Sequence, residues 1–151
     1  MVGHVRKILI SPKKGEPMLS KDEVHALAGR GLAGDRYFAP RAAGKSNNVT
    51  LIESEKIHKF ASVAGLDFTA EDSRRNILTR GIELNPLVGC EFYVGAVKVK
   101  ALELCEPCSL LAKRTHRAVL WGLLHRGGLR CEIITDGIIR LGEIRPVMTN
   151  E

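Results

Sequence analysis

Short runs of alternating apolar and polar residues recur along the chain, and a period of two is typical of β-strands that bury one face. Residues 97–101 show it most clearly, because valine and alanine alternate there with lysine. With residues 91–94 and the connecting Gly95-Ala96 pair they predict a β-hairpin. Further short strands are predicted at residues 5–10, 23–27, 49–52 and 77–79.

A second hairpin is predicted from residues 129–135 to residues 138–141. The intervening Asp136-Gly137 pair accepts the positive φ angles that a two-residue hairpin turn requires. Since the strand signals come in adjacent pairs, the pattern favours antiparallel pairing and does not support parallel βαβ units.

Helical spacing is clearest from residue 54 onwards, where apolar residues recur three and four apart until Gly65 provides a stop signal. Shorter helical segments are predicted at residues 69–72, at residues 109–113 with Ser109 as the cap, and at residues 119–124. Strands outnumber helices, so the pattern predicts one mainly β, barrel-like domain over residues 1–151, with a few short helices as α+β insertions.

Composition narrows the class of protein without identifying it. The 151 residues are 44% hydrophobic and 26% charged, which suits a chain that buries a core without a metal or disulfide staple. No 18-residue apolar run is present, and the first apolar run is too short for a signal-peptide core, so we expect a cytoplasmic protein that makes no membrane contact. The net charge of +6 favours an anionic partner. With few aromatic residues and no known nucleic-acid motif, nucleic acid is not the expected partner.

The Cys105-Glu106-Pro107-Cys108 segment is the strongest candidate for chemistry, because it places two thiols three positions apart. A thiol transfers sulfur or binds a soft metal as the thiolate, and the basic residues that follow Cys108 favour that anion. Cys108 is therefore interpreted as a catalytic or metal-ligating thiol rather than an inert buried one. Cys105 is either a resolving thiol or a packed strand end.

The other cysteines, Cys90 and Cys131, lie in apolar strand patterns and are expected to pack in the core. A reducing cytoplasm argues against disulfides. Zinc is not expected, because the second pair of ligands that a structural zinc site needs is absent.

Two polar clusters are candidates for holding an anion. Arg74, Arg75 and Asn76 precede a predicted strand, and guanidinium groups suit phosphate. Because neighbouring strand positions face opposite ways, only one of the two arginines is expected to reach a pocket. Asp35 and Arg36 follow a glycine-rich turn and are expected at the same pocket, although Asp35 also suits a turn-forming clasp.

The order of these motifs resembles the MOSC domain, the module at the C-terminus of molybdenum cofactor sulfurases and in stand-alone bacterial proteins. The resemblance rests on five stretches, which are residues 31–36, residues 73–77, residues 87–89 with 94–95, Pro107-Cys108, and residues 126–130 with Gly137 and 141–144. It implies a MOSC-type β-barrel in which Cys108 matches the family's characteristic cysteine.

The resemblance also implies work with sulfur or with the molybdenum cofactor. Cys108 would carry sulfur from a partner such as a pyridoxal-phosphate-dependent desulfurase, or would ligate Mo. The alternatives are a non-catalytic module that binds an anion or a partner protein, and a Mo-dependent reductase of N-hydroxylated compounds. The chain lacks the additional N-terminal barrel domain of the amidoxime-reducing relatives and shows no iron–sulfur or flavin motif, so a reductase would need an external electron donor. The oligomeric state is left open.

Overall fold

A computed structural model describes residues 2–40 and 49–146 of the chain. Its strands are β1 (Gly3–Ile10), β2 (Leu19–Lys21), β3 (Glu23–Leu27), β4 (Gly31–Leu32), β5 (Val49–Glu53), β6 (Ile77–Arg80), β7 (Glu91–Val94), β8 (Val97–Leu104), β9 (Leu129–Ile133), β10 (Gly137–Arg140) and β11 (Gly142–Pro146). The helices are α1 (Ser54–Ala64), α2 (Ala70–Ser73), α3 (Ser109–Arg114) and α4 (Val119–Gly122), with a 3-10 turn at Asn85–Leu87. Within the described ranges, no helix is long and apolar enough to cross a membrane.

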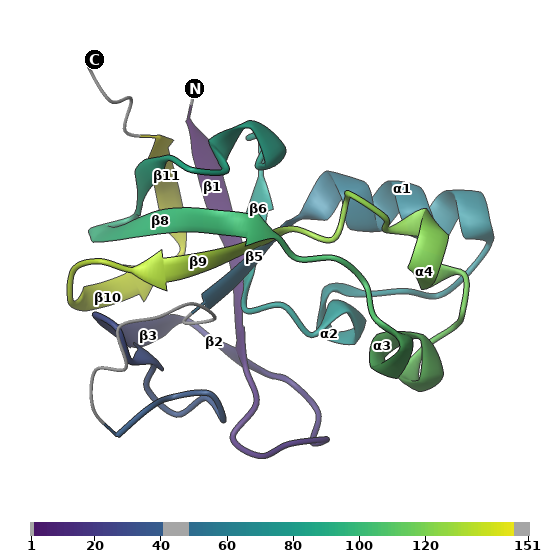
Figure 1. Cartoon of the computed structure of the whole chain (residues 1–151), viewed down its shortest axis with the longest axis horizontal. Coiled ribbons are helices and arrows are strands. Elements are labelled where there is room, and N and C mark those ends of the chain that lie inside the picture. Colours follow the sequence, from purple (N-terminus) through teal and green to yellow (C-terminus); the bar gives the residue numbers. More distant parts are fainter. Residues whose placement is uncertain (1, 41–48, 147–151) are drawn as a thin grey trace.

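Most of the described strands belong to one sheet that closes on itself (Figure 1). Its order is β11-β7-β8-β9-β5-β6-β1-β2, and β1 pairs with β11 as well, which closes seven strands into a barrel. Strands β10, β3 and β4 form a separate small sheet. Fully buried side chains such as Ile8, Leu51 and Phe92 fill the core. The prediction of a mainly β barrel with a few short helices is therefore confirmed.

One of the two predicted hairpins forms. Strands β7 and β8 pair with Val94 opposite Val97, and Gly95 takes a φ of 61° in the turn. The other prediction is wrong, because β10 pairs with β3 rather than with β9. Asp136 does not form a two-residue hairpin turn. Its Oδ1 accepts a hydrogen bond from the Ala28 N–H at 2.7 Å, which ties the segment before β10 to the end of β3.

The expectation of no βαβ unit is also wrong at one place, since β5 and β6 pair in parallel and α1 and α2 lie between them in sequence. Helix α1 packs Ile57 and Phe60 into a second apolar cluster, in which the Phe60 ring meets Phe68 edge-on at 5.2 Å. The connection from β5 to β6 therefore buries apolar side chains of its own. The pairing of neighbouring strand signals in the sequence did not indicate this parallel connection.

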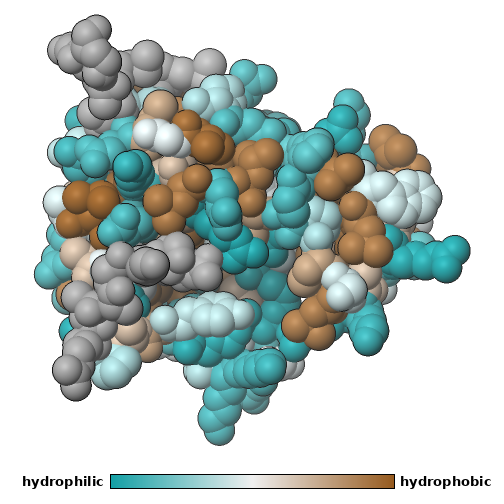
Figure 2. Space-filling model, viewed as in Figure 1, coloured by the Kyte–Doolittle hydropathy of each residue, from teal (hydrophilic) through white to brown (hydrophobic). Residues whose placement is uncertain are grey.

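Two helix starts test the capping predictions. The short helix predicted at residues 69–72 begins with a capping box, in which Asp72 Oδ2 accepts from the Thr69 N–H at 2.9 Å. Ser109 is not a cap: it is the first residue of α3, and Cys108 occupies the N-cap position in an extended conformation. Helix α4 is shorter than predicted. Exposed apolar residues gather over α3 and α4 (Figure 2), and they include Leu110, Leu120 and Leu124.

Candidate functional site at a cationic pocket with two thiols

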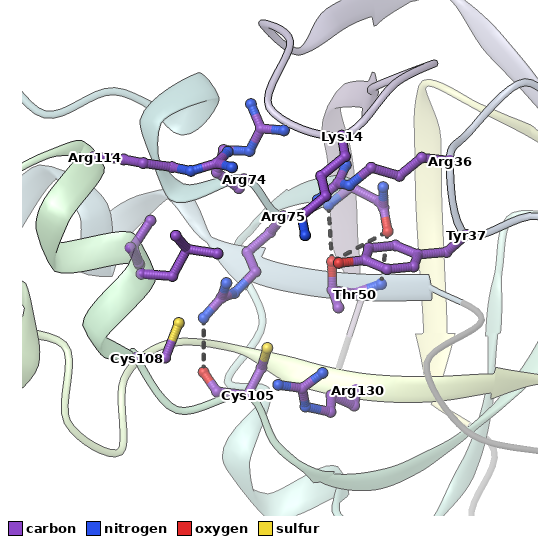
Figure 3. Close-up of a pocket in the computed structure, with 13 residues that line it drawn as sticks. Lys14, Arg36, Tyr37, Thr50, Arg74, Arg75, Cys105, Cys108, Arg114 and Arg130 are labelled. Atoms are coloured by element: carbon purple, nitrogen blue, oxygen red, sulfur yellow. Dashed lines mark hydrogen bonds between the residues drawn. The ribbon is translucent and has the colours of Figure 1, made fainter.

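A pocket of about 220 Å³ lies between the barrel and α3, and positive charge dominates its lining (Figure 3). No Asp or Glu is among the described residues that line it. The cationic lining residues are Lys14, Arg36, Arg74, Arg75, Arg114 and Arg130. Such a concentration of cations around a concave surface attracts anions and raises their local concentration.

Both thiols of the Cys105–Cys108 segment line this pocket. Cys105 follows the end of β8, is 2% exposed, and is fixed by its N–H, which donates to the Gly128 carbonyl at 2.7 Å. Cys108 is exposed and precedes α3. In Figure 3 both sulfur atoms lie on the lower side of the pocket, opposite Arg74 and Arg114. Reagents in solution can therefore reach Cys108 more readily than Cys105.

Arg75 reaches between the two thiols and is held by three backbone carbonyls (Figure 3). Its guanidinium donates to Gly127 at 2.9 Å, to Cys105 at 3.0 Å and to Ser73 at 3.2 Å. Burial lowers the pKa of Arg75, and the neighbouring Cys105 and Cys108 oppose that shift. No described carboxylate forms an ion pair with Arg75, and its positive charge faces the two thiols, the Glu106 carboxylate and whatever anion enters the pocket.

Arg74 lies on the opposite side of the same pocket. It ends α2 in a left-handed conformation, with φ 62°, and donates to the Glu16 carbonyl at 2.6 Å. Burial and then the charges of Arg36 and Arg114 lower the pKa of Arg74, which shows that these cations crowd one another. The expectation that only one of Arg74 and Arg75 reaches a pocket is wrong, because both precede β6 and strand alternation does not apply to them.

The remaining predicted site residues differ in whether their polar atoms are already hydrogen-bonded within the protein. Asn76 lines the pocket, but its amide is occupied: Oδ1 accepts from the Thr50 N–H and Nδ2 donates to the Leu9 carbonyl, both at 3.1 Å. Asp35 is buried and does not line the pocket: its Oδ2 accepts from the Tyr37 N–H at 3.4 Å, which is the turn-clasp role, and its Oδ1 accepts from the distant Ser11 N–H at 2.9 Å. Arg36 lines the pocket.

Outside the pocket, Cys131 packs in the barrel core as predicted, and burial raises the pKa of its thiol. Cys90 is only half-buried and lies outside that core. Across the described residues, no three His, Cys, Asp or Glu side chains come together that could hold a bare metal ion.

Seven lining residues were not among the site residues proposed from the sequence, and these are Lys14, Tyr37, Thr50, Leu110, Leu111, Arg114 and Arg130. The Arg36 guanidinium lies over the Tyr37 ring, with its central carbon 4.5 Å from the centre of the ring. Nothing in the local sequence connects Lys14 or Tyr37 with the cysteines, since only the fold brings their loops to the same pocket.

Comparison with known families decides where the chain belongs. A model of the MOSC domain matches residues 39–144. The chain belongs to the MOSC domain family. No curated protein sequence matches this MOSC domain. Among solved structures, it resembles the YUAD protein from Bacillus subtilis at a TM-score of 0.82, with 17% identity and 98% of each chain covered.

The MOSC domain also resembles two YiiM proteins. For YiiM from Geobacillus stearothermophilus the TM-score is 0.68 and the identity 18%, covering 97% of this chain and 75% of that one. For YiiM from Escherichia coli the TM-score is 0.69 and the identity 18%, covering 98% and 71%. At these identities the likeness concerns the fold alone.

Proposed function

We propose that this MOSC domain binds the molybdenum cofactor, or a related phosphate-bearing sulfur ligand, and that the Cys108 thiolate coordinates the metal. One observation carries the proposal: an exposed thiol shares a pocket with six cationic side chains and no carboxylate among the described lining residues. Thiolate sulfur suits a soft metal, and guanidinium forks suit phosphate. The residues present therefore fit the two ends of such a ligand.

The pocket divides the work between its residues. Arg74, Arg36 and Arg114 would hold the anionic group, because their charges crowd one another and a bound anion relieves that repulsion. Cys108 would hold the metal. When bound, molybdenum would supply oxygen- or sulfur-transfer chemistry, and the protein's own residues would bind and orient the ligand.

Sulfur carriage is a second candidate, favoured by the exposure of Cys108. The Cys108 thiolate would attack the outer sulfur of a donor persulfide. A new S–S bond would form at Cys108 while the S–S bond of the donor breaks, and the donor would leave as a thiolate. A pyridoxal-phosphate-dependent desulfurase is a donor of the required chemistry. Arg75 would face the resulting anionic persulfide.

The two candidates are separated by metal analysis and intact-protein mass spectrometry on protein purified from a host that makes the cofactor. Bound Mo supports the first, and an added sulfur mass supports the second. Cys108→Ala should abolish either signal, whereas Cys90→Ala, which alters a thiol outside the pocket, should preserve it. If neither signal appears in the wild-type protein, or if both survive in Cys108→Ala, the proposal is wrong. Salt-sensitive anion binding that is unchanged in Cys108→Ala would instead indicate a simple binding module.

A further inference from the structure

Two non-glycine residues in the described part of the chain adopt a left-handed backbone, Arg74 with φ 62° and His125 with φ 60°. This conformation crowds a side chain against its own backbone, so it persists only where the surroundings enforce it, and such residues cluster at functional sites. Arg74 lines the pocket. His125 requires a separate explanation, because it is not among the lining residues.

The surroundings of His125 supply that explanation. Its N–H donates to Glu106 Oε1 at 2.7 Å, and its ring Nδ1 lies 2.7 Å from Glu106 Oε2. Since a carboxylate only accepts, Nδ1 is the ring nitrogen that carries the proton. The His125 carbonyl in turn accepts from Asn85 Nδ2 at 2.8 Å. The left-handed backbone thus presents two donors to a single carboxylate, and we name this arrangement the Glu106–His125 clasp.

Glu106 lies between the two thiols in sequence, so the clasp acts on the segment that carries Cys108. Burial opposes ionisation of this carboxyl, but the hydrogen bonds from His125 outweigh it and lower the pKa of Glu106. The preceding residue is anchored separately, by the bond from the Cys105 N–H to the Gly128 carbonyl. The segment is therefore held at two successive residues just before Pro107 and Cys108.

Stability alone does not account for the clasp. Its side chains are exposed, 70% for His125 and 38% for Glu106, and pairs so exposed add little to folding. Glycine would also adopt the backbone of residue 125 without crowding. A histidine at this position is explained if it controls the geometry of the neighbouring thiol.

We propose that Glu106 and His125 are positioning residues that hold Cys108 within the field of Arg75 and the other pocket cations. The proposal rests on the proposed function, in which Cys108 is the working thiol. Without the clasp, the turn before α3 would relax and Cys108 would move away from the pocket cations, so an anionic reagent would lose its advantage over a neutral one in reaching the thiol.

The test is the rate at which anionic iodoacetate and neutral iodoacetamide alkylate Cys108 at one pH, followed by mass spectrometry of its peptide. In His125→Gly and Glu106→Ala, the ratio of the iodoacetate rate to the iodoacetamide rate should fall by about threefold or more, because a thiol displaced from the pocket cations no longer benefits from their attraction for the anionic reagent. The fall should occur in Glu106→Ala although that variant also removes a carboxylate. His125→Asn, which tolerates a left-handed backbone and keeps a donor for Glu106, should recover most of the wild-type ratio.

A matched control is Arg126→Ala, which removes a neighbouring exposed cation but leaves the clasp intact. If His125→Gly keeps the wild-type ratio, or changes it no more than Arg126→Ala does, the positioning role is refuted. His125→Gly should unfold at or above the wild-type temperature, so a fall in the ratio cannot be attributed to loss of folding. Alkylation requires neither Mo nor sulfur donor, so this result is independent of whether the proposed function holds.

Discussion

The substitution Gly127→Ala tests how closely the pocket wall is packed. A β-carbon at residue 127 would lie 2.2 Å from the Cys105 carbonyl oxygen and 3.3 Å from the Arg75 guanidinium. The backbone of Gly127 is not in the left-handed region, so the effect would come from contact alone. The Cys105 carbonyl must move, and it is the acceptor of the 3.0 Å bond from Arg75.

Two costs determine how much stability Gly127→Ala loses, and the structure can lower one of them only by raising the other. Forcing a methyl group into a packed site costs about 1–3 kcal/mol. Relieving the contact by moving the Cys105 carbonyl loses a hydrogen bond from a charged donor, which is worth about 1.5–3 kcal/mol. Because relaxation exchanges one cost for the other, we expect a loss of about 2–4 kcal/mol, which corresponds to a fall in Tm of roughly 5–15 °C for a chain of this size.

The assay is urea and thermal unfolding followed by circular dichroism. Gly142→Ala is the matched control, because Gly142 has no left-handed backbone and a β-carbon there meets no atom within 4 Å. Its stability should stay within about 0.5 kcal/mol of wild type. If Gly127→Ala proves as stable as Gly142→Ala, the close approach of residue 127 to Cys105, and with it the packing assigned to the pocket wall, is incorrect.

Three further predictions concern the pocket, the core and the second apolar cluster. Phosphate at ten times its Kd should stabilise the wild-type protein by about 1.4 kcal/mol. Arg114→Ala should lose most of that gain, because Arg114 and Arg74 would share the anion. An undiminished gain in Arg114→Ala would mean that phosphate binds elsewhere. Because burial raises the pKa of Cys131, the stability of the wild-type protein should fall as pH rises above the ordinary thiol pKa of about 8.5. Cys131→Ala should make that fall shallower by up to about 1.4 kcal/mol per pH unit. Equal slopes of stability against pH in the two proteins, measured by urea unfolding, would contradict this. Phe60→Ala should cost about 3–5 kcal/mol in the same assay, whereas the exposed Val63→Ala on the same helix should cost less than about 0.5 kcal/mol; similar losses would show that the cluster does not support α1.

The pairing of the strands shows where local signals were sufficient. The hairpin at Gly95 formed as predicted, since an alternating strand and its turn lie within one stretch of sequence. The hairpin at Asp136 did not, because the choice between β9 and β3 as the partner of β10 depends on which buried face β10 can cover. The parallel pair β5–β6 escaped notice for the same reason, since its stability comes from α1 packing on a distant cluster.

The sequence by itself determined the types of element, the mainly β class and the identity of the residues able to do chemistry, because these depend on local periodicity and on side-chain type. It placed two thiols three residues apart and marked Arg36, Arg74 and Arg75 as anion-binding candidates. Tertiary structure decided which of those side chains were available. It exposed Cys108, buried Cys131, committed Asp35 to a backbone N–H, and brought Lys14 into the pocket. Exposure, burial and long-range contact arise only when distant segments close around a shared core, and no local pattern encodes that closure.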